Sequence, residues 1–397
     1  MRRAHAKRVM VVFGTRPEAI KLAPILRLLE ESPLLDPVVV VTGQHRRMLD
    51  DVLEAFRIEP DFDLGLLEAR QSLADVTARA LTRLAPVIEA TKPDLAIVQG
   101  DTATTFAGAL AAFYQRVPVA HVEAGLRTYD AQAPFPEEAN RRLTALITDL
   151  HLAPTPSTKR NLVAEGVDPG RVVVTGNTVI DALQRALELE RGFSDPALRD
   201  VESDPRRLLL VTAHRRESWG APLTEIGRAV AEIARRHADL LVVLPIHRNP
   251  VVRERLLREV GTVPNVLVVE PQPYPAFVRL MARANLILTD SGGVQEEAPS
   301  LGKRVLVMRD VTERHEAMGS GAARLVGTSR AEIVAAVSAE LHDDLLADDG
   351  EANVSPYGDG QAARRCVAAI ANLLGLGPTQ EDFAPAEPSR LVVQAAR

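Results

Sequence analysis

The sequence predicts an α/β protein made of two Rossmann-like, doubly wound domains that face a central cleft. Two observations indicate this fold class. Short apolar runs alternate with longer amphipathic segments along most of the chain, which is the pattern of parallel sheets covered by helices. In addition, a chain of 397 residues is long for one compact unit and comfortable for two, so we expect two domains of this kind.

The first predicted domain, residues 1–185, contains six runs with the composition of strands that are buried on both faces. Aliphatic and β-branched residues fill these runs almost throughout, as buried parallel strands require. The stretch 108–114, between two of the runs, has the composition of a helix. In chain order the predicted strands are residues 8–13, 38–42, 95–99, 117–122, 150–153 and 172–175.

The second predicted domain, residues 206–358, repeats this scheme. A helix is expected at 223–235, between its first two strands. The predicted strands are residues 208–212, 240–245, 266–269, 286–289, 305–308 and 324–326.

Three further segments lie outside the two domains. Residues 186–205 carry charge, proline and glycine but no strand pattern, which predicts a linker. Residues 359–375 are expected to contain one more helix. The tail, residues 376–397, is rich in proline, glutamate and glutamine and is predicted to be disordered.

The composition excludes several classes of protein. Lys and Arg total 47 against 53 Asp and Glu, a net charge of −6, whereas nucleic-acid-binding proteins carry a basic excess. Cys366 is the only cysteine, so an intrachain disulfide is impossible and a cysteine-ligated zinc site is disfavoured. No apolar run approaches the roughly 20 residues of a membrane span, and the stretch 9–13 is too short for a signal peptide. We therefore expect a cytoplasmic enzyme that binds neither nucleic acid nor membrane.

The turn after the first strand has the features of an anion site. Ligands of open α/β sheets bind at the carboxyl ends of the strands, so the residues that follow each strand are informative. Here Gly14 permits a tight turn, Pro17 suits a first helical turn, and Arg16 and Lys21 add positive charge to the helix N-terminus. The alternative interpretation is a capped turn with solvated cations.

Three acidic residues are predicted to lie at the same rim of the first sheet. Asp101 follows the third strand, Glu123 follows the fourth, and Glu137 begins a later helix. One such carboxylate alone is usually a helix cap. Three carboxylates that lie close together repel one another, so they need shared protons or cationic neighbours. Such a cluster suits general acid–base chemistry.

The second domain carries a phosphate-site pattern after its strands. Ser291, Gly292 and Gly293 follow the fourth strand and precede a helix, so backbone N–H groups can approach an oxyanion there. Glu296 and Glu297, one turn into that helix, are expected to accept hydrogen bonds from ribose hydroxyls, and Arg314 to clamp a phosphate. The pattern favours a nucleoside diphosphate. The G-x-G-x-x-G fingerprint, the Walker loop and the HExxH pair are missing from the sequence, so neither a cofactor nor a metal is predicted.

Seven ordered motifs make the sequence similar to a known family. They are FGTRPEAIKLAP, VEAGLRT, PEEANR, TGNTVIDAL, TAHRRES, LTDSGGVQEEAPSLGK and PYGDGQA. In them the chain, from about Val9 to about Gly375, resembles the non-hydrolysing UDP-N-acetylglucosamine 2-epimerases. The resemblance implies a GT-B-like pair of domains with UDP held mainly by the second. It also implies a homodimer and a last helix, 361–374, that crosses back to the first domain.

The resemblance implies a role for each matching residue. Asp101, Glu123 and Glu137 receive acid–base roles, and His214 a catalytic or leaving-group role. Contacts to UDP or to the reacting sugar are expected from Arg16, Lys21, Arg141, Phe277, Ser291, Gly292, Gly293, Glu297 and Arg314. Many bacterial relatives bind a second UDP-N-acetylglucosamine (UDP-GlcNAc) as an activator, and the residues that match that site are Gln44, Arg70, Arg215 and His247.

The reaction that the resemblance implies is reversible epimerisation of UDP-GlcNAc at C2. The product is UDP-N-acetylmannosamine (UDP-ManNAc), a precursor of surface polysaccharides. The expected route is anti elimination of UDP to 2-acetamidoglucal, followed by re-addition. Three alternatives stay open. A hydrolysing epimerase would release ManNAc and UDP, a glycosyltransferase of the same fold would need an acceptor, and a nucleotide-sugar sensor would bind without turnover.

Overall fold

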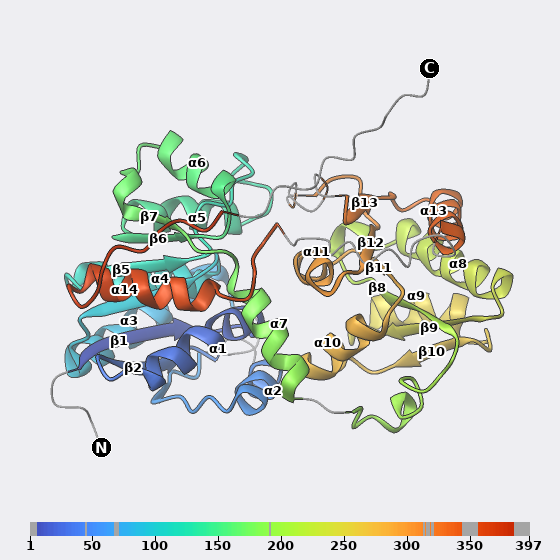
Figure 1. The fold of residues 1–397 in the computed structure, drawn as a ribbon, viewed down its shortest axis with the longest axis horizontal. Helices are drawn as coiled ribbons and strands as arrows, with labels where there is room; N and C mark the ends of the chain where they lie inside the picture. The colour runs from blue at the N-terminus through green and yellow to red at the C-terminus, as the bar shows by residue number, and fades with distance from the viewer. Residues whose placement is uncertain are drawn as a thin grey trace. The chain divides into compact units, whose positions relative to one another are not determined.

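Figure 1 shows the computed structural model of the chain, which describes residues 6–43, 46–66, 71–189, 192–312, 314, 318, 321–343 and 356–384. The described residues divide into two compact units. Unit 1 is made of two separate stretches, Met1–Arg185 and Tyr357–Ala384, and unit 2 includes Ala186–Pro356. Each unit has one parallel sheet with helices against it, so the predicted α/β class is confirmed.

Unit 1 contains a seven-stranded parallel sheet with the order β3-β2-β1-β4-β5-β6-β7. The strands are β1 (Lys7–Phe13), β2 (Leu35–Val41), β3 (Phe62–Asp63), β4 (Leu95–Gln99), β5 (Val119–Val122), β6 (Leu150–Ala153) and β7 (Val172–Val174). The helices that begin in this unit are α1 (Arg16–Glu31), α2 (Arg46–Phe56), α3 (Leu73–Thr91), α4 (Ala103–Tyr114), α5 (Glu137–Leu146), α6 (Pro156–Ala164), α7 (Thr178–Leu189) and α14 (Ala362–Leu373). A 3-10 turn, η1 (Pro169–Arg171), precedes β7.

The strands of unit 1 bury side chains on both faces. On one face Met10 and Val12 of β1 pack with Leu84 and Ile88 of α3. Toward the viewer in Figure 1, α1 and α14 lie side by side, and the two helices contact each other. The first residues of α14 are held by Asp181, whose carboxylate accepts hydrogen bonds from the backbone N–H groups of Ala362 and Ala363. The last helix of the chain thus packs within unit 1.

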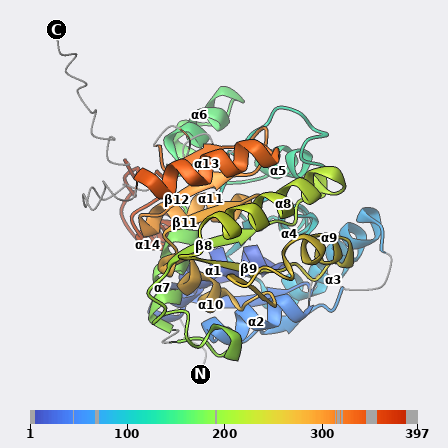
Figure 2. The same ribbon diagram turned by 90° about the vertical axis from the view of Figure 1, so that its right-hand side faces the viewer.

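Unit 2 contains a six-stranded parallel sheet with the order β10-β9-β8-β11-β12-β13. The strands are β8 (Arg207–Thr212), β9 (Leu240–Pro245), β10 (Val266–Val269), β11 (Leu286–Thr289), β12 (Arg304–Val307) and β13 (Ala323–Leu325). The helices are α8 (Ala221–Arg236), α9 (Pro250–Val260), α10 (Tyr274–Arg283), α11 (Gly292–Glu297) and α13 (Arg330–Asp343), with 3-10 turns η2 (Pro196–Leu198), η3 (Arg216–Ser218) and η4 (Ala298–Leu301). Figure 2 shows α13, α8 and α9 over one face of this sheet.

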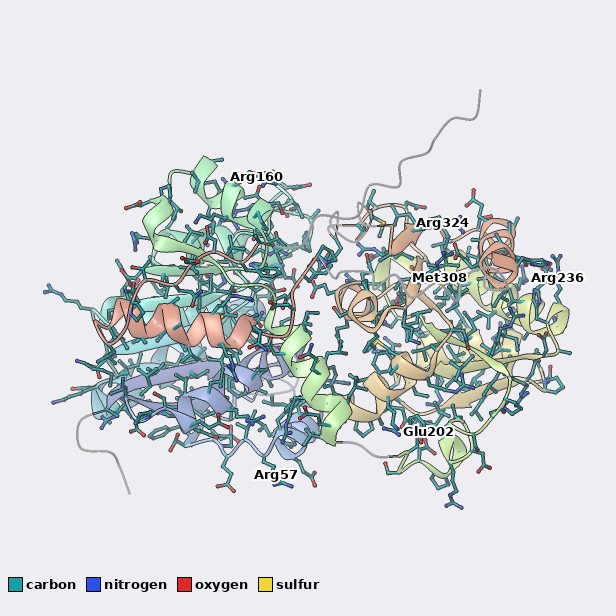
Figure 3. All side chains as sticks on the ribbon, in the orientation of Figure 1. Arg57, Arg160, Glu202, Arg236, Met308 and Arg324 are labelled. Carbon is teal, nitrogen blue, oxygen red and sulfur yellow. The ribbon has the colours of Figure 1, made fainter. Side chains whose placement is uncertain are left out.

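Side chains follow the usual division between core and surface in both units. Figure 3 labels Arg160 of unit 1 and Arg236 of unit 2, which are exposed, and Met308, which is fully buried in the unit 2 core. The core of unit 2 joins the strands to α8, α9 and α13 through aliphatic residues. Burial of this aliphatic surface is the main source of stability of such a sheet–helix layer.

Both sheets reverse their strand order at one point. In unit 1 the reversal lies between β1 and β4, and in unit 2 between β8 and β11. Connections leave toward opposite faces there, which opens a crevice at the carboxyl ends of the strands where ligands bind in folds of this kind. The candidate residues of each unit should therefore be sought at these two positions.

The predicted linker, residues 186–205, differs from expectation. The helix α7 continues to Leu189, and further along Leu198 and Val201 are buried. The carboxylate of Asp195 accepts a 2.9 Å hydrogen bond from Gln272. The described part of this stretch therefore packs as part of unit 2. The sequence pattern missed this because its few apolar residues are isolated among charged ones.

The predicted disordered tail is also partly corrected. Asp382 accepts a 2.7 Å hydrogen bond from the N–H of Val174, and the N–H of Phe383 donates to the carbonyl of Val174, also at 2.7 Å. Lys159 forms a 2.6 Å ion pair with Asp382. Residues 376–384 thus belong to unit 1 and end along the edge of β7. Two residues of this otherwise polar segment, Asp382 and Phe383, are sufficient to anchor it there. Residues 385–397 lie outside the described residues.

Candidate active site

The turn after β1 brings the chain close to two neighbouring elements. A Cβ atom on Gly14 would lie 2.0 Å from Oγ1 of Thr42 and 2.7 Å from Oγ1 of Thr104, so only glycine fits there. The helix α1 then begins at Arg16, which is partly exposed. The predicted cation is thus at a helix N-terminus beside the strand-order reversal of unit 1.

Glu123 stands immediately after β5 and is held from several sides. Its backbone has a φ of +63°, in the left-handed region, which non-glycine residues adopt mainly where the surroundings demand it. Lys21 lies 2.5 Å from Oε1, and Gln99 donates a hydrogen bond to Oε2. Asn177 reaches Oε1 at 3.5 Å. The structure therefore fixes this nearly buried carboxylate in one orientation.

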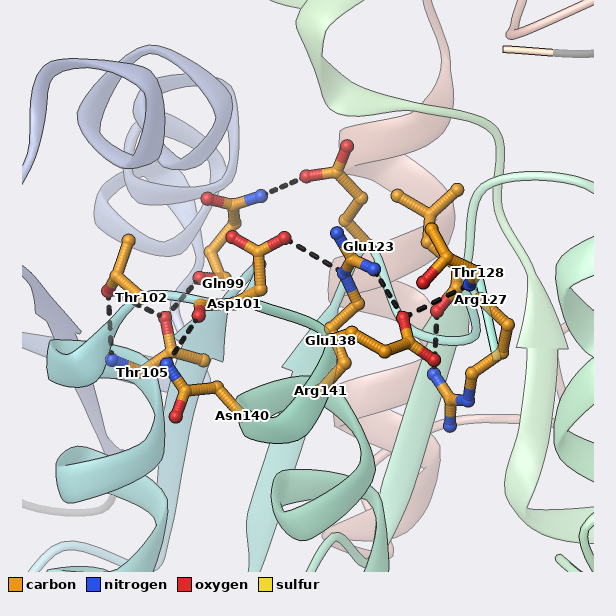
Figure 4. Close-up of polar contacts among 12 residues, drawn as sticks. Gln99, Asp101, Thr102, Thr105, Glu123, Arg127, Thr128, Glu138, Asn140 and Arg141 are labelled. Carbon is orange, nitrogen blue, oxygen red and sulfur yellow. Dashed lines mark hydrogen bonds and ion pairs between the residues drawn. The ribbon is translucent and has the colours of Figure 1, made fainter. Parts of the chain in front are cut away.

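Asp101 forms a second carboxylate position, shown in Figure 4 beside Glu123. Arg141 donates from Nε to Oδ2 of Asp101 at 2.9 Å, and Asn140 donates to the Asp101 carbonyl at 2.9 Å. The Asp101 side chain is 28% exposed, whereas that of Arg141 is 7% exposed. A guanidinium buried behind a more open carboxylate holds that carboxylate in place and leaves it available to a ligand.

Glu138 is a functional candidate that the sequence analysis missed. Its side chain is fully buried and accepts a 2.6 Å hydrogen bond from Arg141. It also accepts hydrogen bonds from the backbone N–H groups of Thr128, at 3.1 Å (Figure 4), and of Tyr129, at 3.2 Å. Glu138 therefore holds both the loop after β5 and the arginine behind Asp101. The signal was the doubled acid in PEEANR, of which only Glu137 received a role.

Glu137 differs from the other two predicted acids. It is half-buried at the start of α5, and its Oε2 atom is buried with no hydrogen-bond partner among the described residues. An unsatisfied buried oxygen costs free energy unless a proton or a ligand satisfies it. The three acids of unit 1 thus have three different surroundings: a fixed ion pair, a partly open carboxylate beside arginine, and an unpartnered oxygen.

In unit 2 the turns after β8 and β11 are joined by Asp290. This aspartate is fully buried and accepts hydrogen bonds from the backbone N–H groups of His214 and Arg215, at 2.7 and 2.9 Å. The Nδ1 atom of His214 lies 3.2 Å from Oδ1 of Asp290. Burial opposes ionisation of Asp290, but the hydrogen bonds and charge of His214 outweigh it, so the pKa of Asp290 is lowered. Asp290 therefore orients His214, and the sequence analysis gave it no role.

His247, which follows β9, stacks on His214. The two ring centroids are 5.6 Å apart and the ring planes differ by 16°. Burial and the neighbouring His214 lower the pKa of His247. A predicted catalytic residue and a residue predicted for the activator site are therefore in direct contact.

Two arginines meet at the first residue of α11. A Cβ atom on Gly292 would lie 3.2 Å from an Nη atom of Arg215 and 3.3 Å from the guanidinium carbon of Arg314. Arg314 is held by Glu296, whose Oε1 accepts from Nε at 2.9 Å. Two guanidinium groups over a glycine can bind phosphate oxygens from close range. Arg314 is expected to clamp a phosphate here, whereas Arg215 is expected at the activator site.

The remaining predicted residues of unit 2 lie on α11 and α10. The backbone N–H of Ser291 donates to Thr289, which fixes the turn before α11. Glu297 accepts a 2.9 Å hydrogen bond from the hydroxyl of Tyr274, and its carboxylate lies beside Gly293. Phe277 is partly buried on α10, one turn after Tyr274.

Two predicted residues, Gln44 and Arg70, lie outside the described residues. In the described part of the chain, no helix is long and apolar enough to span a membrane. A search of the same residues finds no group of three or more His, Cys, Asp or Glu side chains placed to hold a metal ion.

Comparison with known proteins gives consistent matches across the chain. The family model described as UDP-N-acetylglucosamine 2-epimerase matches residues 27–371. The UDP-N-acetylglucosamine 2-epimerase of Escherichia coli K12 is 50% identical over 370 residues, which cover 92% of this chain and 98% of that protein. The Bacillus subtilis 168 protein of the same name is 48% identical over 380 residues, covering 94% and 98% of the two chains.

Solved structures give the same result. S. aureus MnaA in complex with UDP matches with a TM-score of 0.87 and 44% identity, over 95% of this chain and 100% of that one. The Neisseria meningitidis UDP-GlcNAc 2-epimerase bound to UDP-GlcNAc matches with a TM-score of 0.83 and 43% identity, over 92% and 100% of the two chains. A kitacinnamycin glycosyltransferase shares the fold alone, with a TM-score of 0.61 and 17% identity.

Proposed function

The chain belongs to the UDP-N-acetylglucosamine 2-epimerase family, and from this premise we propose that it interconverts UDP-GlcNAc and UDP-ManNAc without net hydrolysis. The proposal includes the route: elimination of UDP to 2-acetamidoglucal, followed by re-addition of UDP. It also includes action as a homodimer in the cytoplasm.

The chemical difficulty lies at C2 of the sugar. The C2 proton is next to no carbonyl, so direct removal by a carboxylate would be very slow. In anti elimination, a base takes the C2 proton while the C–H electron pair forms the C1–C2 double bond. The C1–O bond breaks, and UDP leaves with its electron pair. Return of a proton to the opposite face of C2 and attack of UDP on C1 give the epimer.

The observation that carries this proposal is the set of three carboxylates in unit 1. Epimerisation by this route needs a base and an acid that hold their protons with different strength. Glu123 is paired with Lys21, Asp101 with Arg141, and Glu137 has an unpartnered buried oxygen. Three carboxylates in different surroundings give the site candidates for both the base and the acid.

The leaving group is assigned to residues of unit 2. Departure of UDP places negative charge on its β-phosphate, which guanidinium groups and backbone N–H groups stabilise. Arg215 and Arg314 meet at Gly292 and supply the positive charge. His214, oriented by Asp290, is proposed to contact the same phosphate. Tyr274 fixes Glu297 for the ribose hydroxyls.

Activation by a second UDP-GlcNAc is proposed on the histidine pair. His247 belongs to the residues expected to bind the activator, and its ring stacks on His214. A ligand that moves His247 would therefore change the position of His214. A sigmoidal dependence of the rate on UDP-GlcNAc concentration would support activation. A hyperbolic dependence of the reverse rate on UDP-ManNAc concentration, without added UDP-GlcNAc, would count against it.

The test of the proposed reaction is incubation with UDP-GlcNAc alone, followed by proton NMR. We expect UDP-ManNAc to accumulate to a constant ratio with UDP-GlcNAc. Release of free ManNAc and UDP in equal amounts would instead identify a hydrolysing enzyme. Turnover that begins only when an acceptor sugar is added would identify a glycosyltransferase.

A further inference from the structure

We propose that Glu18 is a positioning residue, which fixes the turn that carries Asp101 relative to the helix that carries Lys21. The inference rests on the proposed function, since it gives Glu18 a part in that reaction. The hydrogen bonds of Glu18 come from Gly14, Thr15, Thr102 and Thr105, and none of these four is a predicted site residue. The effect of Glu18 would be exerted through the backbone of two neighbouring turns.

The two carboxylate oxygens of Glu18 serve two different turns. Oε2 accepts hydrogen bonds from the backbone N–H groups of Gly14, at 2.8 Å, and Thr15, at 2.6 Å, in the turn after β1. Oε1 accepts from the hydroxyl of Thr102 at 2.5 Å and lies 3.1 Å from the hydroxyl of Thr105, in the turn after β4. The Glu18 side chain thus joins the turns that follow β1 and β4, the two strands between which the strand order of the sheet reverses.

This arrangement exceeds what helix capping needs. A capping box requires only that the N3 carboxylate reach the backbone N–H of the N-cap residue, and Glu18 does this for Thr15. Asp75 does the same for Ser72 at the start of α3, but Asp75 is exposed and serves that turn alone. Glu18 is 2% exposed. Burying a carboxylate opposes its ionisation and raises the pKa of Glu18, so the site carries a cost that a cap does not demand.

The two turns that Glu18 joins, after β1 and after β4, are both next to residues that contact or include the candidate acids. Thr102 follows Asp101 in the chain and is the N-cap of α4. The hydroxyl of Thr105 also approaches the carbonyl of Gln99, at 2.6 Å, and Gln99 contacts Glu123. On the other side Lys21 lies one turn after Glu18 on α1 and contacts Glu123. Removing the Glu18 carboxylate therefore loosens Asp101 relative to the Lys21–Glu123 pair.

Two matched pairs of variants test this. Glu18→Ala leaves two backbone N–H groups without their acceptor, whereas Glu18→Gln keeps one oxygen for them and offers its NH2 group to the Thr102 hydroxyl, which can accept as well as donate. Thr102→Val removes the 2.5 Å hydrogen bond between the Thr102 hydroxyl and Glu18 without altering Glu18, and Thr102→Ser retains it. Asp75→Ala, at the same position of another helix, α3, is the control for loss of a capping box.

For each variant we would measure kcat and KM with UDP-GlcNAc, the affinity for UDP by calorimetry, and the melting temperature. We expect Glu18→Ala and Thr102→Val to lower kcat about 10- to 100-fold, because small misplacement of a reacting group costs about that much. UDP affinity should stay unchanged in both, and Glu18→Gln and Thr102→Ser should restore kcat. Asp75→Ala should lower only the melting temperature.

Three results would overturn the inference. Normal kcat in both Glu18→Ala and Thr102→Val would show that the link has no effect on the reaction. A kcat as low in Glu18→Gln as in Glu18→Ala would mean that the charge itself takes part. A loss of kcat in Asp75→Ala as large as that in Glu18→Ala would show that the loss follows from lower stability and not from the position of Asp101. If Glu18→Ala does not fold, the Thr102 pair decides. Failure of the proposed function is recognised separately, because the unaltered protein would then not epimerise UDP-GlcNAc.

Discussion

The ammonium group of Lys21 lies 2.5 Å from Oε1 of Glu123, with the two side chains only 12% and 8% exposed. The residues come from α1 and from the end of β5. At such a site little water screens the attraction, so the pair holds the carboxylate in one place. Glu123 also has left-handed backbone geometry, which turns its side chain away from the direction that the strand would give it.

Glu123→Gln should lower turnover by about 10²- to 10⁴-fold, the usual cost of losing a general acid or base. The amide keeps the shape of the side chain and loses the charge that accepts a proton. UDP affinity, measured by calorimetry, should change little. Lys159→Met is the control, because the Lys159–Asp382 pair of unit 1 is more exposed and has no proposed role in the reaction. Near-normal turnover in Glu123→Gln would remove this residue from the acid–base set.

The neighbouring acids Glu137 and Glu138 should behave oppositely. Glu137→Gln should lower kcat with little loss of stability, because its buried Oε2 has no partner to lose. Glu138→Ala should lower the free energy of unfolding by about 3–5 kcal/mol, since it leaves the buried Arg141 guanidinium without one of its partners. Denaturant unfolding and NMR rates on both variants separate the two effects. A stability loss in Glu137→Gln as large as that in Glu138→Ala would contradict the distinction.

Arg314→Ala should weaken UDP binding by about 10- to 100-fold, the value of one or two charge-assisted hydrogen bonds. Gly292→Ala should weaken it too, because the added methyl group would press on Arg314 and on Arg215. Arg304→Ala is the matched control, since this arginine forms an ion pair with Glu340 in the same unit. Calorimetry with UDP measures all three. If Arg314→Ala binds UDP with unchanged affinity, the proposed position of the phosphate beside Arg314 is wrong.

The buried histidines predict how stability depends on pH. Burial lowers the pKa of His121 to about 4 and that of His151 to about 3, from an ordinary 6.5. Below pH 6.5 the unfolded chain therefore binds protons that the folded chain does not, so the free energy of unfolding falls as pH falls. His151→Leu should flatten this slope between about pH 4 and 6 by about 1.4 kcal/mol per pH unit.

Asp181 supplies a comparison of opposite sign. Burial raises its pKa from 3.8 to about 6, so between these values the folded chain holds the extra proton. Its contribution therefore opposes that of the histidines, and Asp181→Asn should make the slope steeper over the same range. Urea unfolding at intervals of pH measures both variants. Parallel plots for the unaltered protein and His151→Leu would show that His151 does not titrate as described.

Isotopes test the proposed elimination directly. In D2O, a carboxylate that exchanges its proton before re-addition places deuterium at C2 of both UDP-ManNAc and recovered UDP-GlcNAc. Because the C1–O bond breaks, oxygen-18 placed in the bridge between C1 and the β-phosphate should move into non-bridging positions. Bridging label that stays in place after many turnovers would rule out elimination. Missing deuterium alone would not, since a shielded carboxylate can return the same proton.

The fold was predictable because the strands are buried on both faces. A strand such as β4 is then a continuous apolar run, which is visible without any alignment. By contrast, β3 has two residues and leaves no pattern. The packing of Leu198 and Val201 and the anchoring of Asp382 were missed for a related reason: each depends on one or two residues in a polar stretch.

The site was predictable only in part. Polar residues at strand ends, such as Asp101 and Glu123, stand out because the runs before them are apolar. Glu18 and Glu138 lie in the first turns of helices, where an acidic residue is ordinarily a cap or a partner of the helix dipole. Their burial follows from contacts with residues far away in the chain. Nothing in the local sequence distinguishes them from exposed caps such as Asp75.

The separation of unit 1 into two stretches has a consequence for how the protein is made. Domains generally fold during synthesis as their residues leave the ribosome. The sheet of unit 1 is complete by Val174, yet α14, which packs on α1, is synthesised only after residues Ala186–Pro356 of unit 2. During that interval the apolar side of α1 lacks one of its coverings. Nascent chains should therefore depend on chaperones longer for the half that is made first than for the half that is made last.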